Sequence, residues 1–408
     1  MSTVNIAQGA RKIEWARAHM PLMAMLASEL AATKPLAGLT VAASIHLEAK
    51  TAVMAQTLAS AGAEVRATGC NPLSTQDDVA AALAETPNIK VFAKRGVTET
   101  EYHDDLHKTL NGGVDAFIDD GGDLCALLHG PLANLQKRVK GGTEETTTGV
   151  RRLRALHAQK KLNLPMTAVN DAQMKYLFDN RYGTGQSVWD GIMRTTNLTV
   201  AGKTVVIAGY GWCGRGVAMR ASGMGARVIV TEIDPVRAIE AMMDGFSTLP
   251  MSKAVYKGDI FVTVTGCRDV LTPEHFRRMK DGAILCNAGH FDVEVDVAGL
   301  RSMATDVQKV RENIECYTQK NGQKLYLLGE GRLVNLACAD GHPAEVMDVS
   351  FALQTLSILE IVAKDKRKPG LYPVDPGIDR QIAQMRLQTM GGEVDMLTEK
   401  QAAYYNGE

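Results

Sequence analysis

The chain has 408 residues, which is too long for one ordinary hydrophobic core and predicts about two or three domains. Its 45 Lys and Arg residues nearly cancel its 46 Asp and Glu residues, which argues against general nucleic-acid binding. The seven cysteines lack CxxC pairs and metal-ligand spacing, so we expect neither a disulfide framework nor a bound metal. No signal-like N-terminus or run of membrane-spanning length is evident, and we expect a cytoplasmic protein without a membrane partner.

The first half of the chain alternates predicted helices and strands. A helix is expected over residues 15–32, where the Met and Leu residues indicate core packing. Short apolar strands are expected at 39–44, 63–68, 90–94, 114–120 and 164–171, with helices at 48–62 and 79–85. Apolar strands separated by amphipathic helices predict a parallel sheet that is covered on both faces. Such sheets bind ligands at the carboxyl ends of their strands.

Polar residues gather at these predicted carboxyl ends. His46 follows the strand at 39–44, and Asp119 and Asp120 end the strand at 114–120. Asn170 and Asp171 end the strand at 164–171 in the same way. Asp and Gly are also ordinary turn formers after a strand, so one such cluster is more often structural than functional.

Three further segments carry polar groups that have a structural and a functional interpretation. Residues 144–148, Glu-Glu-Thr-Thr-Thr, are typical of a helix start with a Thr cap and an acidic first turn. Lys175 and Asp179 are four residues apart, a spacing that suits a surface ion pair on a helix. His290 follows a predicted strand at 283–287.

Residues 204–216, TVVIAGYGWCGRG, join an apolar strand to a glycine turn and a segment compatible with a helix. Gly209 permits the tight turn, Gly211 lets the backbone approach a pyrophosphate, and Gly214 lets the helix pack closely. The next strand ends at Glu232, whose carboxylate can accept hydrogen bonds from an adenosine ribose and favours NAD over its phosphorylated form. The alternative is a glycine-rich turn in an α/β domain that binds no ligand.

Nine segments along the chain resemble, in order, the signatures of the S-adenosylhomocysteine hydrolase family. They are NPLSTQDDVAAAL, DDGGDL, EETTTGV, ND(x3)K(x3)DNRYG, AGYGWCGRG, TEIDP, CNAGHFDVE, EGRLVNL and GHP. The resemblance covers nearly the whole chain, from about residue 35 to residue 401. It implies an α/β fold in which a Rossmann NAD domain, residues 183–340, interrupts a second α/β domain that binds substrate, residues 1–182 and 341–390. A helical C-terminal tail, residues 391–408, is expected to contact a neighbouring subunit in a homotetramer.

The resemblance also implies the reaction and the residues that perform it. Members of the family oxidise the ribose 3′-OH of a nucleoside thioether with tightly bound NAD, which acidifies the C4′ hydrogen. Homocysteine then leaves by elimination, water adds, and the hydride returns to the ribose. The resemblance thus implies reversible hydrolysis of S-adenosyl-L-homocysteine to adenosine and L-homocysteine, with S-inosyl-L-homocysteine as the alternative substrate. The implied roles are 3′-OH binding and deprotonation by Lys175 and Asp179, C4′ proton abstraction by Asp120, proton transfer by His46 and His290, and binding near the 2′-OH by Glu145.

The residues expected to contact NAD come from both predicted domains. The resemblance assigns this role to Thr146, Thr147, Thr148, Asn180, Gly209, Gly211, Trp212, Cys213, Gly214, Glu232, Asn287 and Asn335. This chain departs from the family pattern at Thr184, where many members have a cysteine beside the nicotinamide. It departs again at Trp212, Cys213 and Arg215, where an Asp-Val pair and Lys are usual. The loop geometry demands only the glycines, so we expect it to be preserved.

The purine that the enzyme binds depends on the segment after His46. Where Glu48 and Lys50 stand, many members have Thr and Gln or Glu, and the second of these accepts a hydrogen bond from the adenine 6-amino group. Lysine can only donate, and hypoxanthine offers O6 as an acceptor and N1–H as a donor. Members of a shorter branch that this chain resembles act on S-inosylhomocysteine. The alternative is that Lys50 turns outward or pairs with a neighbouring carboxylate, while backbone groups and His342, with Thr51 nearby, bind adenine.

Two other classes of protein share parts of this pattern. A simple NAD-dependent dehydrogenase of hydroxy or amino acids has the interrupted two-domain plan, but it does not need a carboxylate, a lysine and two histidines around one ribose. A non-catalytic relative that senses the cofactor is expected to have lost part of that set. The set is complete in this sequence.

Overall fold

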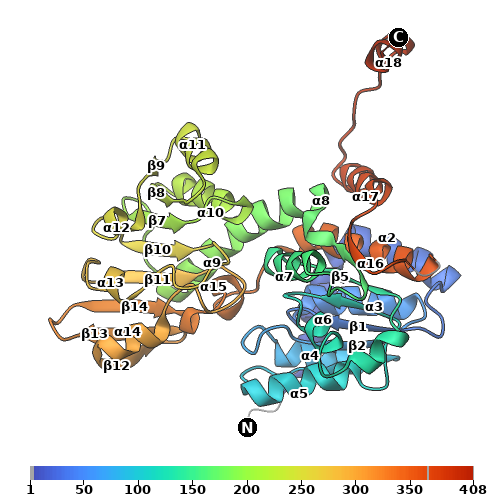
Figure 1. Cartoon of the computed structure of the whole chain (residues 1–408), viewed down its shortest axis with the longest axis horizontal. Helices are drawn as coiled ribbons and strands as arrows, with labels where there is room; N and C mark the ends of the chain where they lie inside the picture. The colour runs from blue at the N-terminus through green and yellow to red at the C-terminus, as the bar shows by residue number, and fades with distance from the viewer. Residues whose placement is uncertain (1–3, 365–366, 408) are drawn as a thin grey trace.

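The computed structural model describes residues 4–364 and 367–407, and it contains two lobes, each built on one sheet (Figure 1). The first sheet has seven strands in the order β15-β6-β5-β4-β1-β2-β3, and all neighbouring strands are parallel. The strands are β1 (Thr40–Ser44), β2 (Glu64–Thr68), β3 (Ile89–Phe92), β4 (Ala116–Asp119), β5 (Gly141–Glu144), β6 (Pro165–Ala168) and β15 (Gly370–Pro373). The helices of this lobe are α1 (Ile6–Ala18), α2 (Pro21–Thr33), α3 (Ala49–Ser60), α4 (Asp77–Ala84), α5 (Glu99–Leu110), α6 (Asp123–Leu128), η1 (Ala133–Lys137), α7 (Thr147–Ala158), η2 (Val169–Asp171), α16 (Ala344–Ala363) and α17 (Pro376–Thr389).

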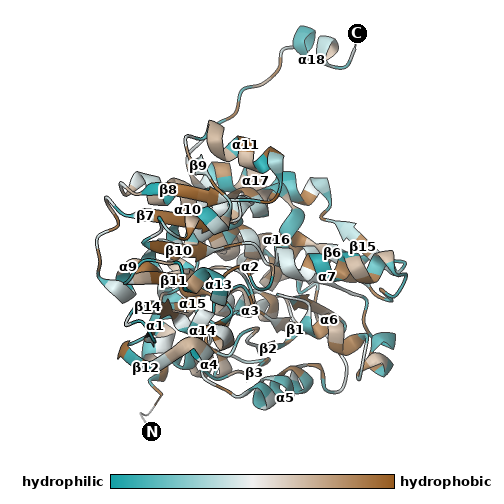
Figure 2. Cartoon of the chain, turned by 60° about the vertical axis from the view of Figure 1, so that its left-hand side comes forward, coloured by the Kyte–Doolittle hydropathy of each residue, from teal (hydrophilic) through white to brown (hydrophobic). Residues whose placement is uncertain are grey.

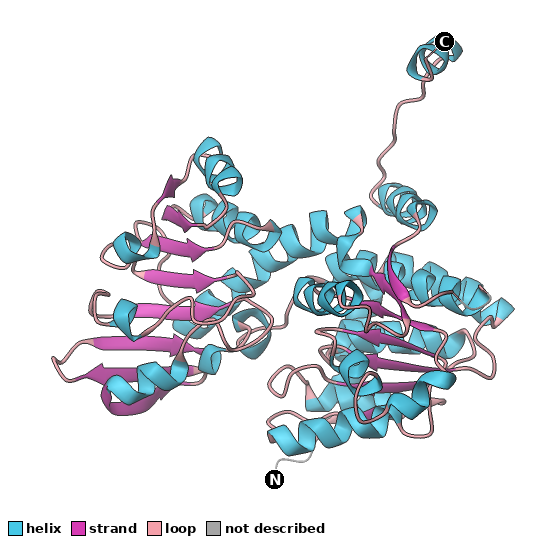
Figure 3. Cartoon of the chain, in the orientation of Figure 1, coloured by secondary structure: helices cyan, strands magenta, loops and turns pink. Residues whose placement is uncertain are grey.

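The second sheet has eight strands in the order β12-β13-β14-β11-β10-β7-β8-β9 (Figure 3). They are β7 (Thr204–Ala208), β8 (Arg227–Thr231), β9 (Ser247–Thr248), β10 (Ile260–Thr263), β11 (Ala283–Asn287), β12 (Ala304–Arg311), β13 (Ile314–Gln319) and β14 (Lys324–Leu328). The helices are α9 (Thr184–Thr196), α10 (Trp212–Gly223), α11 (Pro235–Met243), α12 (Met251–Ala254), α13 (Pro273–Phe276), α14 (Val297–Met303), η4 (Gly329–Gly331) and α15 (Val334–Ala337). β13 pairs antiparallel with both β12 and β14, and the other pairs are parallel.

The strand order reverses at β7, which has β8 on one side and β10 on the other. Open α/β sheets bind ligands in the crevice at such a switch point. The predicted fold class, a Rossmann-type lobe inserted in a second α/β lobe, is confirmed. The predicted limits of the domains stay predictions.

The lobes are joined by α8 (Gln173–Lys175), the π-helix η3 (Tyr176–Gly183) and α9 on the outward path, and by the segment before α16 on the return. Single-turn π-helices are frequent at functional sites, and here eight residues adopt this geometry. Beyond α17 the chain extends away from both lobes to α18 (Glu399–Tyr405), as Figure 1 shows.

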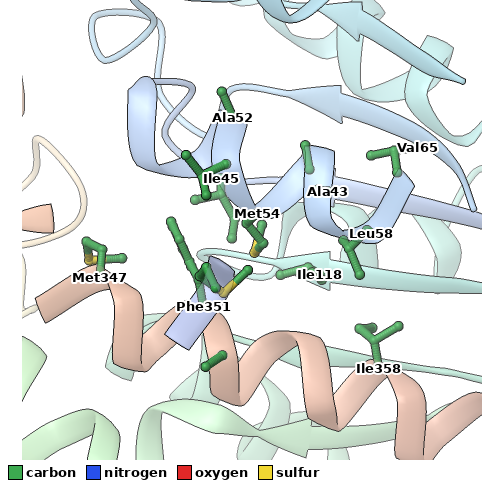
Figure 4. Close-up of a cluster of buried hydrophobic side chains, with 14 of the residues drawn as sticks. Ala43, Ile45, Ala52, Met54, Leu58, Val65, Ile118, Met347, Phe351 and Ile358 are labelled. Carbon is green, nitrogen blue, oxygen red and sulfur yellow. The ribbon is translucent and has the colours of Figure 1, made fainter. Parts of the chain in front are cut away.

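Helix α16 forms the centre of the first lobe's core. Met347 and Phe351 project from it toward Ile45, which follows β1, Met54 of α3 and Ile118 of β4 (Figure 4). Its 20 residues are long and apolar enough to span a membrane by length and composition, so the expectation that no run reaches that length is wrong. Two thirds of the most apolar part are buried inside the protein, which is typical of a core helix. Apolar residues are likewise concentrated in the central strands of the second sheet (Figure 2).

The structure differs from the prediction in two places in the first lobe. The helix expected over 15–32 is two helices, because Pro21 starts a new helix at its first position, where the missing N–H costs nothing. Strand β5 was not predicted, since Gly141 and Gly142 have low strand propensity. A side chain at Gly142 would lie 2.6 Å from the Phe117 ring, so the glycine is required by packing in the sheet.

Candidate active site

A cavity of about 960 Å³ lies between the lobes, at the carboxyl ends of strands from both sheets. Most of the predicted site residues line it: His46, Glu48, Lys50, Thr51, Asp120, Glu145, Thr146, Thr147, Thr148, Lys175, Asp179, Asn180, Gly209, Gly211, Trp212, Cys213, Glu232, His290, Asn335 and His342. These residues are scattered over nearly 300 positions of sequence, and the fold brings them to one place. The polar residues at the ends of the predicted strands therefore share one cavity and are not only formers of separate turns.

Lys175 lies at the centre of a buried group of polar side chains. Its Nζ is 3.1 Å from Asp179 Oδ1 and 3.4 Å from Glu145 Oε1, and it donates to Asn180 Oδ1 at 2.7 Å. The Lys175 and Asp179 side chains are 5% and 4% exposed, so the alternative of a surface ion pair is wrong. Lys175 ends α8 and Asp179 lies in η3, and the hydroxyl of Ser350 of α16 donates to Asp179 Oδ2 at 2.9 Å.

Charge and burial set the protonation states in this group. Burial lowers the pKa of Lys175, but Asp179 and Glu145 outweigh it, so the pKa is raised and the amine is an ammonium. Burial raises the pKa of Asp179, but Lys175 and His342 outweigh it, so the carboxyl stays ionised. Burial is the dominant effect on Glu145 and raises its pKa to about 7. Glu145 therefore exchanges a proton near neutral pH.

A second group places Asp120 between two histidines that come from different lobes. His46 Nε2 is 3.5 Å from Asp120 Oδ2, and His290 Nδ1 is 3.6 Å from Asp120 Oδ1. Burial lowers the pKa of His46 to about 4 against the opposing effect of Asp120, so its imidazole is neutral at physiological pH. The Cys70 thiol donates to Asp120 Oδ2 at 3.4 Å, and Ser74 Oγ lies 2.8 Å from His46 Nδ1. One ring nitrogen of His46, one ring nitrogen of His290 and one carboxylate oxygen of Asp120 all lie within 4.8 Å of one another. The sequence spacing of these residues did not reveal this grouping.

The Asp-Asp-Gly-Gly loop allows the two lobes to meet. Gly121 has φ +107, and a Cβ there would lie 2.4 Å from His290 Nε2. Glu144 Oε1 accepts hydrogen bonds from Gly121 N at 2.9 Å and from Thr146 N at 3.0 Å, which fixes this loop. The prediction that Glu144 and Glu145 form an acidic first turn is wrong, because β5 ends at Glu144 and α7 begins after Thr146.

Several buried residues that touch the predicted site were missed. They are Cys70, Ser74, Glu144, Ser350 and Gln354. Gln354 of α16 donates to Glu145 Oε2, and Ser350 is one turn before it. Polar residues at one-turn spacing within an otherwise apolar helix are the signal that points to this face of α16.

The crevice beside β7 fits a dinucleotide. A Cβ at Gly211 would have its nearest neighbour at 3.9 Å, so the turn is open to a ligand that approaches the backbone. Gly209 has φ +104, which the tight turn requires. Glu232 Oε2 accepts from Tyr210 N at 2.7 Å and lines the cavity at the end of β8. Among the described residues, the buried Asn335 Oδ1 has no hydrogen-bond partner, and Asn335 is one of the residues that line the cavity.

Two of the predicted cofactor residues, Gly214 and Asn287, do not line the cavity among the described residues. A Cβ at Gly214 would lie 2.1 Å from Gly209 O, so this glycine allows α10 to pack against the turn, as expected from the motif. Asn287 is fully buried, and in the part of the chain that the structure describes it is not among the cavity-lining residues. Its amide instead binds Gly289 and Phe291 backbone groups, so Asn287 holds the loop that carries His290.

Glu48 and Lys50 form an ion pair at the end of the cavity next to the returning chain. Lys50 Nζ is 2.7 Å from Glu48 Oε2 and donates to the Asp340 carbonyl oxygen at 2.7 Å. Glu48 also accepts from Lys50 N and Thr51 N and so caps α3. Lys50 is only 7% exposed, so it does not turn outward, but it does pair with a neighbouring carboxylate, as the adenine-binding alternative expected. At the same end of the cavity, His342 Nδ1 lies 3.2 Å from Asp179 Oδ1, and His342 Nε2 lies 3.2 Å from Thr184 Oγ1.

Comparison with known proteins agrees with this geometry. Residues 2–136 match the family described as S-adenosyl-L-homocysteine hydrolase, and residues 180–341 match its NAD-binding domain. The S-inosyl-L-homocysteine hydrolase of Methanosarcina acetivorans is 54% identical over 402 residues, which cover 98% of this chain and 97% of the relative. The adenosylhomocysteinase of Thermotoga maritima is 53% identical over 97% of this chain and 98% of its own length. That of Archaeoglobus fulgidus is 54% identical over 97% of this chain and 98% of its own length. The chain therefore belongs to the S-adenosyl-L-homocysteine hydrolase family, enzymes that hydrolyse a nucleoside thioether with NAD as the cofactor.

Proposed function

We propose that this enzyme is an S-inosyl-L-homocysteine hydrolase, which releases inosine and L-homocysteine. The observation that carries the proposal is that the buried Lys50 ammonium and the Glu48 carboxylate both line the cavity, which places a donor and an acceptor side by side on its wall. An ammonium has three donors, and two of those on Lys50 have oxygen partners in the protein. The third N–H of the Lys50 ammonium suits the O6 acceptor of hypoxanthine. The other carboxylate oxygen of Glu48, Oε1, suits the N1–H donor of the same base.

Adenine presents the opposite pattern of donors and acceptors. Its 6-amino group would face the Lys50 ammonium, and a mismatched buried donor costs about 1–3 kcal/mol, or ten- to two-hundred-fold in selectivity. S-adenosyl-L-homocysteine is the second candidate substrate, because Glu48 can accept a hydrogen bond from the 6-amino group while Lys50 stays bound to Asp340 O. Relatives of similar identity carry each of the two names, so sequence identity alone does not discriminate.

The decisive measurement is kcat/KM for both thioethers with the wild type, Lys50→Gln and a control, Lys108→Gln. The wild type is expected to prefer the inosine substrate, and Lys50→Gln is expected to lose that preference by ten-fold or more. Lys108 forms an exposed ion pair with Asp105 on α5 and is not among the described residues that line the cavity, so its replacement should leave the ratio unchanged. An adenosine preference that Lys50→Gln does not alter would eliminate the inosine proposal.

The protonation states suggest how the protein's residues serve the 3′ carbon. Lys175 is an ammonium in this arrangement, so it must lose a proton before it can deprotonate a hydroxyl. Glu145, with a pKa of about 7 and an oxygen 3.4 Å away, is the neighbour suited to take it. When bound, NAD supplies the hydride acceptor for the 3′ carbon, and Asp179 and Asn180 keep Lys175 in place.

The second group of side chains suits the elimination and water-addition steps. Asp120 is the proposed base for the C4′ hydrogen, and the flanking histidines can move a proton to the sulfur and from water. His46 is neutral, which suits a proton acceptor. The contact of His290 with Asp120 requires both lobes, so this step depends on their closure.

The proposed assembly is a cytoplasmic homotetramer without nucleic-acid or membrane partners. Its support is the exposed apolar surface on the C-terminal segment, where Met396, Leu397, Tyr404 and Tyr405 are all more than 60% exposed. Removal of residues 391–408 is expected to reduce the particle mass below that of four chains, measured by light scattering. An unchanged mass would contradict the proposed role of the tail.

A further inference from the structure

Two residues of the glycine turn that depart from the family pattern, Trp212 and Arg215, form a stack with Tyr176. The Tyr176 and Trp212 rings are 5.0 Å apart between centroids and inclined by 28°. The Arg215 guanidinium lies 4.6 Å from the Trp212 ring centroid, and it is held by an ion pair with Glu240 at 2.5 Å. Stacked aromatic and cation–π contacts of this kind are each favourable. The stack therefore fixes the Trp212 ring.

The stack joins two elements with different tasks. Trp212 is the first residue of α10, which starts at the glycine turn, and it lines the cavity. Tyr176 directly follows Lys175 and is the first residue of η3, which also carries Asp179. Among the described residues Tyr176 is not part of the cavity lining, so it reaches a bound dinucleotide only through Trp212.

Backbone packing makes α10 and η3 one unit. A Cβ at Gly216 of α10 would lie 1.7 Å from Arg181 O of η3. A Cβ at Gly185 of α9 would lie 2.6 Å from Gly216 O. Since the backbones are in contact here, α10 cannot slide against η3, and Trp212 is the member of the side-chain stack that lines the cavity.

We propose that the stack of Tyr176, Trp212 and Arg215 is a positioning element that couples dinucleotide binding at the glycine turn to the placement of Lys175. A pyrophosphate at the N-terminus of α10 orders the first turn of that helix, which includes Trp212. Trp212 then orders Tyr176, and the ammonium of the adjacent Lys175 is held toward the ribose. This inference rests on the role proposed above for Lys175.

The test is a double-mutant cycle on the holoenzyme and on protein freed of NAD. Tyr176→Ala and Trp212→Ala are each expected to weaken NAD binding about five- to tenfold, measured by calorimetry without substrate. The double variant is expected to bind NAD as tightly as the single variant with the lower affinity, because each substitution alone already removes the same contact between Tyr176 and Trp212. Tyr176→Phe and Trp212→Phe keep a stacking ring and should restore binding to within about twofold of the wild type.

A second readout follows the chemistry rather than the affinity. At saturating NAD, both alanine variants should lower kcat and the fraction of NAD reduced on addition of inosine, while KM for the nucleoside changes little. The matched control is Phe178→Ala, which removes another stacked ring of η3, 6.3 Å from Tyr182 and 37% exposed. This control should bind NAD as the wild type does.

Three results would overturn the coupling. They are wild-type NAD affinity in Tyr176→Ala, additive losses in the double variant, and equal losses in Phe178→Ala. Failure of the proposed role of Lys175 would be visible separately, as hydrolysis by Lys175→Met, and it would leave the NAD-binding cycle unchanged. Circular dichroism of each variant identifies any loss that comes from unfolding, and in that case the phenylalanine variants decide the outcome.

Discussion

At the scale of single residues, Lys175 and Asp120 are placed by the reaction rather than by packing. Lys175→Met and Asp120→Asn are each expected to reduce turnover by about 10²–10⁴-fold, because a group that moves a proton is lost. NAD should remain bound, since neither substitution touches the glycine turn. Lys108→Met is the control, because Lys108 forms an exposed ion pair on α5 far from the cavity lining. Near wild-type hydrolysis by either active-site variant would contradict the assignment.

His46 makes the stability of the protein depend on pH. Its folded-state pKa of about 4 lies below the ordinary 6.5, so between these values the unfolded chain binds a proton that the folded protein does not. The free energy of unfolding therefore rises as pH increases from about 4 to 6.5, by at most about 3 kcal/mol from this group. Replacing His46 with Asn should flatten the pH dependence of the denaturant midpoint in that window. An unchanged slope would show that His46 is not buried in its neutral form.

At the scale of elements, Asp348 of α16 caps helix α2 from outside its own segment. Its carboxylate accepts from Leu22 N at 3.1 Å and Met23 N at 2.9 Å, and the residue that precedes α2, Met20, provides no side-chain cap. Asp348→Ala leaves two buried N–H groups without partners and is expected to cost about 2–4 kcal/mol of unfolding free energy. Asp348→Asn keeps one acceptor oxygen and should cost about half as much. Equal stability of the alanine variant and the wild type in denaturant titrations would refute this cap.

At the scale of the whole molecule, the contact between Gly121 and His290 limits how far the lobes close. A nucleoside inhibitor is expected to reduce the radius of gyration in X-ray scattering, with the hinge near residues 179–184 and 341–343, because closure excludes water from the reactive ketone. Gly121→Ala should block this change, since its Cβ would meet His290 at 2.4 Å. Gly122→Ala is the matched control, with φ +83 but no atom nearer than 3.8 Å. Identical profiles of the wild type with and without inhibitor would exclude closure.

The sequence by itself determined the fold class, the cofactor and most residues of the site. The alternation of apolar strands and helices and the Gly209-Gly211-Gly214 pattern depend on local rules, because strand propensity and turn geometry act over a few residues. The resemblance to the family, and not a local rule, implied that His46 and Asp120 belong to the site, and both line the cavity.

Only the tertiary structure decided features that depend on contacts between distant segments. Strand β5 exists because Gly142 fits beside Phe117, and two glycines give no strand signal of their own. The lobes bring His290 to Asp120, and α16 adds Ser350 to the Lys175 group, across separations that no local pattern encodes. Burial then sets the protonation states, because removing water from a carboxyl or an imidazole disfavours its charged form. The sequence thus specified which groups are present, while the packing of two lobes decided their partners and their charges.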